Sequence, residues 1–166
     1  MVAEFWFRVA VMFLLAFAGG CGRPGGNLTA VFGSEYGIDT VRNATTVKAF
    51  RLKSPAAQHE VLSDYEMITG PLDVPESAAS ELRELLLDPA IYGWDSVKGC
   101  IPDFGVRIQF QRESDTADVL LCFECDILAV FHNGKYVGGE DFDEAHSKFI
   151  AILKGLFKDD EVIQGL

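Results

Sequence analysis

The sequence predicts an α+β fold: an antiparallel sheet of about five strands with two helices on one face, in the order β-β-α-β-β-β-α. Three observations lead to this expectation. Apolar and polar residues alternate from Gly105 to Gln111, as they do in a half-buried strand. The pair Asn133-Gly134 divides a later apolar stretch and is typical of a two-residue hairpin turn. Residues 73–88 and 141–157 instead carry apolar residues at helical spacing.

The first half of the chain is predicted to supply two strands. The run from Val47 to Leu52 is compatible with a strand and is stopped by "SPAA". A second strand is expected from Tyr65 to Thr69, and the pair Gly70-Pro71 is expected to break it. Residues 28–44 have apolar residues at both helical and strand spacings, so they predict either a short helix or a loop.

Each predicted helix begins with an Asp-x-x-Glu pattern. Asp73 and Glu76 would form one capping box, and Asp141 and Glu144 would form the other. Pro89 is expected to end the first helix, because proline restricts the residue before it. The residues expected to face the core are Ala78, Leu82, Leu85 and Leu86 in the first helix and Ala145, Phe149, Ile152, Leu153 and Leu156 in the second.

The second half of the chain is predicted to be a series of hairpins. "VLLCF" is apolar on both faces, which predicts a strand inside the sheet with side chains packed on each side. If the preceding turn is centred near Ser114, Val106 lies opposite Cys122. The hairpin around Asn133-Gly134 predicts two cross-strand pairs, Phe131 with Tyr136 and Val130 with Val137.

Length and composition indicate one domain with a substantial core. The chain has 166 residues, of which 49% are hydrophobic and thirteen are Phe. With 14 basic against 25 acidic residues, its formal net charge is −11. A chain of this charge repels phosphate backbones and anionic headgroups, so we expect no binding to nucleic acid.

The N-terminus has the pattern of an export signal that ends at a cysteine. It begins "MVAEFWFRVAVMFLLAFAGGCGRPGG". Arg8 precedes an uncharged apolar run, Val9 to Ala18, whose length suits a signal peptide better than a membrane span. Small residues follow and lead to Cys21, a pattern that resembles the lipobox of bacterial lipoprotein signal peptides. The resemblance implies that residues 1–20 are removed, that the Cys21 thiol is alkylated by a diacylglycerol, and that the new N-terminus is acylated, a palmitate-type modification.

The same resemblance implies a location and a domain organisation. Residues 21–27 would be the lipidated cysteine and a Gly/Pro tether reaching about 25 Å, and residues 28–166 would be a single α+β domain. We expect the protein in the cell envelope, held to the membrane by its lipid anchor on the periplasmic side, with an envelope protein as partner. Gly22 stands where some bacteria place an inner-membrane retention Asp, which favours the outer membrane. The alternatives are an ordinary secretory signal that leaves Cys21 a free thiol and a retained membrane anchor.

The stretch "CFEC" raises the question of what Cys122 and Cys125 do. On a straight strand, residues three apart point to opposite faces with Cα atoms about 10 Å apart, whereas a disulfide needs about 4.4 to 6.8 Å. The two thiols therefore cannot bond to each other unless the chain bends between them. A bulge at Phe123-Glu124 would bring both to one face, and Cys100, just before the strand that starts at Gly105, could then reach them.

Four interpretations of these thiols remain open. A disulfide from Cys100 to either Cys122 or Cys125 fits an exported protein. The thiols could instead act as small buried hydrophobic residues. A zinc-type site would use Cys100, Cys122, Cys125 and His132, whereas the other three interpretations involve no cofactor. The fourth interpretation is a redox dithiol, although such pairs usually sit at a helix N-terminus and no helix is predicted here.

Four residues, Cys100, Cys122, Phe123 and Cys125, also resemble a pattern in uncharacterised bacterial lipoproteins, in which a lone cysteine precedes a CFxC strand. The resemblance covers about a quarter of the chain, up to Phe142. It implies that the three thiols belong together, and it brings no known activity.

No pattern in the sequence identifies an enzyme. Motifs of the GxSxG, HExxH, P-loop and GxGxxG types are absent, so no catalytic residue is predicted. The acidic residues Glu140, Asp141, Asp143 and Glu144 could bind calcium, but carboxylates at the start of a helix are also favourable without a metal. The expected function is a lipid-anchored envelope protein that acts as a non-catalytic interaction or structural module. The alternative is a thiol-based metal-binding or redox protein.

Overall fold

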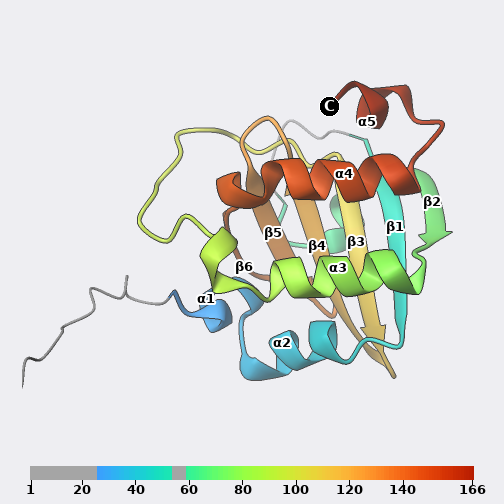
Figure 1. The fold of residues 1–166 in the computed structure, drawn as a ribbon. Coiled ribbons are helices and arrows are strands. Elements are labelled where there is room, and N and C mark those ends of the chain that lie inside the picture. Colours follow the sequence, from blue (N-terminus) through green and yellow to red (C-terminus); the bar gives the residue numbers. More distant parts are fainter. Residues whose placement is uncertain (1–25, 54–58) are drawn as a thin grey trace, which may run out of the picture.

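The structure, a computed structural model, describes residues 26–53 and 59–166. Six strands form one antiparallel sheet in the order β2-β1-β3-β4-β5-β6 (Figure 1). The strands are β1 (Thr46–Leu52), β2 (Met67–Asp73), β3 (Val106–Arg112), β4 (Asp115–Cys122), β5 (Ile127–His132) and β6 (Lys135–Asp141). The α+β class is confirmed. The sheet has one strand more than expected, because the run from Asp118 to His132 is divided into two strands, β4 and β5, that pair with each other.

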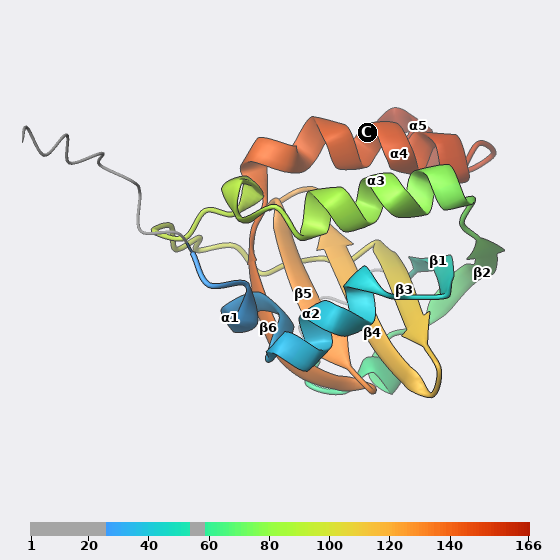
Figure 2. The same ribbon diagram turned by 60° about the horizontal axis from the view of Figure 1, so that its bottom comes forward.

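The α-helices of the described residues all bury their apolar side on the same face of the sheet. They are α1 (Leu28–Phe32), α2 (Glu35–Arg42), α3 (Glu76–Leu86), α4 (His146–Leu156) and α5 (Glu161–Gly165). Each contributes to the main core, through Val31, Ile38, Leu82, Phe149 and Ile163 respectively. Figure 1 shows α3 and α4 crossing the sheet side by side, and Figure 2 shows α1 and α2 on the same side of it. Residues 28–44, predicted as a short helix or a loop, thus form two short helices.

A second, smaller core covers part of the opposite face. The main core takes alternate residues of β4, including Val119 and Leu121, and the second core takes Leu120 and Cys122 between them. No helix of the layer described above covers this second core; a short 3-10 turn, η1 (Leu62–Asp64), and Tyr65 pack there. The prediction that "VLLCF" lies inside the sheet with packing on both sides is therefore confirmed.

Two predicted registers differ from the structure by one residue. Arg112 pairs with Asp115, so the turn consists of Glu113 and Ser114, and Val106 lies opposite Leu121 rather than Cys122. In the next hairpin, Phe131 pairs with Tyr136 as predicted. Val130 pairs with Gly138 and not with Val137, because the register shifts between Val130 and Phe131. Such a shift adds an unpaired residue to one strand and cannot be seen in an alternating pattern.

The two predicted capping boxes are wrong. Asp73 and Asp141 are the last residues of β2 and β6, and neither caps a helix. Pro75 stands at the N-cap of α3, without a side-chain hydrogen bond. A 3-10 turn, η3 (Asp143–Ala145), leads into α4. Most of the residues predicted to face the core are buried. In α3, however, Ala79 is buried where Ala78 was expected, and in α4, Ile152 and Leu156 are only half-buried.

Strand β2 continues through the residues that were expected to end it. It begins at Met67, two residues after the predicted start, and passes through the cis Gly70-Pro71 bond to Asp73. The sheet tolerates Pro71 because β2 is an edge strand, where one backbone N–H need not pair with a neighbour.

The two edges of the sheet are built differently. At the β6 edge, α1 packs so closely that a Cβ on Gly138 would stand 2.2 Å from the carbonyl oxygen of Ala30. At the other edge, β2 is exposed over almost its whole length. Within the part of the chain that the structure describes, no strand pairs with the outer side of β2. The outer side of β6 is partly paired, since Val61 forms a bridge with Lys135 and the Tyr136 N–H donates to the Glu60 carbonyl oxygen, whereas the outer side of β2 is open.

No helix in residues 26–53 or 59–166 combines the length and the apolar character needed to cross a membrane.

Candidate functional site

The CFEC stretch is a turn between two strands. Strand β4 ends at Cys122, residues 123–126 reverse the chain, and β5 begins at Ile127, which pairs with Cys122. Asp126 adopts a φ of 52°, a left-handed conformation that suits a tight turn. The predicted bulge at Phe123-Glu124 is therefore replaced by a complete reversal. The reversal separates the two cysteines by placing one on a strand and the other in a turn.

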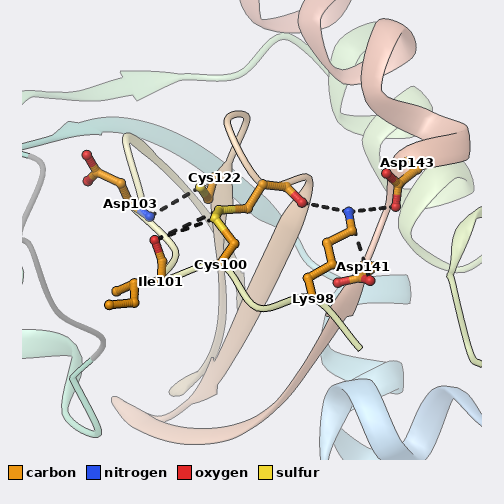
Figure 3. The surroundings of a disulfide bond; sticks show 8 residues. Lys98, Cys100, Ile101, Asp103, Cys122, Asp141 and Asp143 are labelled. Carbon is orange, nitrogen blue, oxygen red and sulfur yellow. Dashed lines mark hydrogen bonds and ion pairs between the residues drawn. A yellow bond between two sulfur atoms is a disulfide. The ribbon is translucent and has the colours of Figure 1, made fainter. Parts of the chain in front are cut away.

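Cys125 in this turn forms a disulfide with Cys100. Their Cα atoms are 6.2 Å apart, inside the range that a disulfide requires. Cys100 comes from the long segment between α3 and β3, which folds back along the end of the sheet (Figure 3). Of the four interpretations left open by the sequence, the structure contains the disulfide from Cys100 to one of the pair.

The third thiol, Cys122, is free and has an exposed fraction of 0%. It lies in the second core with Cys125, Tyr65 and Phe104. The backbone N–H of Asp103 donates a hydrogen bond to its sulfur at 3.2 Å (Figure 3). The structure thus brings all three thiols to one end of the sheet.

A largely buried lysine holds the disulfide-bonded turn to the start of α4. Lys98 Nζ donates to the carbonyl oxygen of Cys125 at 2.6 Å and to the carboxylate of Asp143 at 2.7 Å. It also lies 3.9 Å from the carboxylate of Asp141, and Figure 3 shows it pointing between the two aspartates. The hydroxyl of Ser96 donates to Asp141 as well. Two of the acidic residues considered for calcium are thus engaged by a cation of the protein itself.

His132 is not brought to the thiols. It ends β5, whereas Cys122 pairs with Ile127 at the start of that strand, and its ring packs edge-on against Tyr36 with centroids 5.6 Å apart. Across residues 26–53 and 59–166, no group of three or more His, Cys, Asp or Glu side chains is placed to hold a metal ion.

A buried ion pair on the second face was not predicted from the sequence. Asp118 of β4 has an exposed fraction of 0%, and its Oδ1 accepts hydrogen bonds from Arg107 Nε at 2.8 Å and from Gln109 at 3.1 Å. The other oxygen, Oδ2, has no hydrogen-bond partner among the described residues. Burial raises the pKa of Asp118, and the attraction of Arg107 only partly opposes that effect.

Arg107 also borders a shallow cavity of about 620 Å³ on this face. Its guanidinium carbon lies 4.6 Å from the ring centre of Phe50, so the arginine is fixed by a ring on one side and by a carboxylate on the other. Tyr65, Met67 and Lys135 form other walls of the cavity. The only signal of this cluster in the sequence is an aspartate inside an apolar run, directly before "VLLCF".

Comparison with known proteins found no matching family model, no significantly similar curated protein and no significantly similar solved structure. The predicted signal peptide and Cys21 lie outside the described residues, as does most of the predicted tether 21–27.

Proposed function

We propose that this chain is a cell-envelope protein, anchored to the membrane by lipid at Cys21, whose folded part is a non-catalytic interaction module. The observation that carries the proposal is the Cys100–Cys125 disulfide. Disulfides persist in oxidising compartments outside the cytosol and are rare within it. A disulfide in the folded part therefore supports a location outside the cytosol, which is also the location that the lipobox-like sequence ending at Cys21 implies.

The anchor is tested by following processing of the full chain in a bacterial host. Wild type is expected to incorporate a fatty-acid analogue, to remain with the membrane fraction, and to accumulate as an unprocessed precursor in the presence of globomycin. Cys21→Ser removes the thiol that accepts the lipid, so the variant is expected to lose the label and leave the membrane. A variant that is still labelled and still membrane-bound would refute the anchor at this residue.

The compartment is tested by counting thiols. The chain has four cysteines, of which Cys21 would be alkylated, Cys100 and Cys125 are bonded, and Cys122 is buried. The processed protein is expected to expose no reactive thiol when folded, one after unfolding without reductant, and three after unfolding with reductant. Three reactive thiols without reductant in protein taken directly from cells would contradict an oxidising location.

A second candidate function is thiol-based redox exchange, and one observation favours it. Cys122 keeps a free thiol in the same buried cluster as the disulfide-bonded Cys125. In such a function, the Cys100–Cys125 disulfide would accept two electrons and two protons from a partner dithiol, which would itself become a disulfide. A midpoint potential near that of cellular dithiols would favour this function. A much lower potential identifies a structural disulfide.

A further inference from the structure

An apolar groove lies at the end of the sheet, beneath α5 and beside the open edge strand β2. Its volume is about 340 Å³. Apolar side chains from β2, from the CFEC turn and from α5 line it, namely Ile68, Phe123, Val162 and Leu166. Three of these are unusually exposed for their type, with Ile68 at 61%, Val162 at 64% and Leu166 at 43%. Exposed apolar side chains gathered around a groove mark an interaction site more often than single exposed residues do.

The cations of the groove are already paired within the protein. The Arg51 side chain donates to the carboxylate of Asp160 at 2.8 Å and to the carbonyl oxygen of Gly105. Lys53 pairs with Glu66 at 2.9 Å. Neither cation is therefore free to attract an anionic ligand.

The carboxylates of the groove are not paired. Asp103 and Glu124 line it and form no ion pair with any residue that the structure describes. In Asp103, the atom Oδ1 is buried and has no hydrogen-bond partner in that part of the chain. No donor of the described residues therefore compensates this carboxylate, and a positive charge in the groove would complement it. The groove thus has apolar walls and two carboxylates, Asp103 and Glu124, that no cation of the described residues neutralises.

Strand β2 adds a backbone component to this site. Ile68 belongs both to the groove and to β2, whose outer side is open while the opposite edge of the sheet is partly paired through Val61 and Lys135. An open edge strand offers N–H and C=O groups to an extended peptide, and a neighbouring pocket selects alternate side chains of that peptide. Pro71 offers no N–H, so the added strand is expected beside residues 67–70.

We propose that this groove and the outer edge of β2 together dock an extended segment of a partner protein in which lysine or arginine alternates with apolar residues. The proposal rests on the proposed function only in treating the folded part as an interaction module. A second copy of this chain is disfavoured as the occupant, because two molecules that each carry a formal net charge of −11 repel one another.

The test uses the full chain purified in detergent and a fluorescent probe peptide of alternating valine and lysine. Binding is followed by fluorescence anisotropy, with a valine–glutamate peptide of the same length as comparison. The basic peptide is expected to bind about tenfold or more tightly than the acidic one, and the difference should shrink as salt is added. Methylation of the basic peptide's backbone nitrogens removes the donors that strand addition needs, so it should abolish binding.

Substitutions at exposed positions locate the site. Ile68→Lys places a positive charge on the β2 edge and is expected to raise the Kd of the basic peptide about tenfold or more. Val61→Lys is the matched control, because this exposed valine lies outside the groove and the substitution changes the net charge equally. It should leave the Kd unchanged. Glu124→Gln should raise the Kd severalfold at low salt.

Three results would overturn the proposal. One is equal affinity for the basic and acidic peptides. Another is unchanged affinity in a folded Ile68→Lys variant, with folding checked by its urea midpoint. The third is a dimer that Ile68→Lys dissociates and Val61→Lys does not, which would assign the groove to a second copy. A missing fatty-acid label at Cys21 would refute the anchor and leave these binding results intact, so the two failures are distinguishable.

Discussion

Asp118 and Arg107 are diagonal neighbours on the same face of the sheet. The residues directly opposite in the β3–β4 ladder are Gln109 with Asp118 and Arg107 with Leu120, so the guanidinium reaches two residues along the ladder to the carboxylate. Two of its nitrogens lie 2.8 Å from the same oxygen, Oδ1. Diagonal cross-strand neighbours are within reach of a side chain as long as arginine.

Removing both members of this pair should cost less stability than the two single removals added together. Asp118→Ala leaves Arg107, whose side chain is only 13% exposed, without its counter-ion, and should lower the free energy of unfolding by about 3 kcal/mol. The double variant Asp118→Ala with Arg107→Met removes both charges and should lose less than the sum of the single losses. Urea unfolding of the four proteins gives the coupling energy. Strict additivity would show that the two charges do not stabilise each other.

Reducing the Cys100–Cys125 disulfide should destabilise the domain. Cys100 and Cys125 are 25 residues apart, and opening a loop of this size is expected to lower the free energy of unfolding by about 3 kcal/mol. The measurement is urea unfolding with and without dithiothreitol. In Cys100→Ser the bond is already absent, so reductant should have no further effect. An equal effect of reductant on wild type and on this variant would contradict the Cys100–Cys125 pairing.

The attachment of α5 should weaken in acid. Asp160 accepts hydrogen bonds from the backbone N–H groups of Val162 and Ile163 and from Arg51. Partial burial acts to raise its pKa, but the hydrogen bonds from Ile163 and Arg51 outweigh burial and hold the pKa below its usual value. A carboxyl whose folded pKa is lowered stabilises the fold above its unfolded pKa, near 4, and loses this contribution as the pH falls through the folded pKa.

Asp160→Asn isolates the effect of the charge, because asparagine still caps a helix. Between about pH 5 and pH 2, wild type should lose more stability than the variant does. Unfolding midpoints in urea across this range provide the measurement. Parallel pH profiles would mean that the Asp160 charge contributes nothing.

Two glycines should respond to alanine in opposite directions. In Gly138→Ala the new methyl group would stand 2.2 Å from the Ala30 carbonyl oxygen, so α1 must move away from β6, and we expect a loss of at least about 2 kcal/mol. A methyl group added to Gly155 of α4 would instead point into open space, with no atom beyond its own helix backbone within 4 Å. Gly155→Ala should therefore stabilise the protein by up to about 1 kcal/mol through helix propensity. Thermal unfolding would show both, and an unchanged midpoint in Gly138→Ala would contradict the close approach of α1.

The sequence predicts which helices and strands this fold contains better than it predicts where they begin and how the strands are aligned. Periodicity identifies β3 and the core stripe of α4, because burial on one face imposes an alternation of apolar residues that the chain displays directly. The helix starts were wrong because an Asp-x-x-Glu pattern also occurs where a strand ends, as at Asp73 and Asp141. The register at Val130 depends on a bulge, which leaves no mark in the composition of the strand.

The thiol site was predicted in part for a similar reason. Geometry along a straight strand argued against a bond between Cys122 and Cys125 unless the chain bends, and export favoured a bond to Cys100, but choosing the partner needed the position of the turn. The sequence from β4 to β5 gives no clear signal of that turn, because Phe123 within it is apolar, half-buried and packed against Phe142 like a core residue. Burial of Asp118 could not be deduced from its place before "VLLCF" alone, since it depends on Arg107 being available on the adjacent strand.

The Cys100–Cys125 bond closes a covalent ring around the hairpin of β3 and β4. The exposed turn of Glu113 and Ser114 lies inside that ring. A protease that cuts after Glu113 would therefore nick the backbone without releasing a fragment, and the cut chain would separate into two pieces only when the sulfur bridge is reduced.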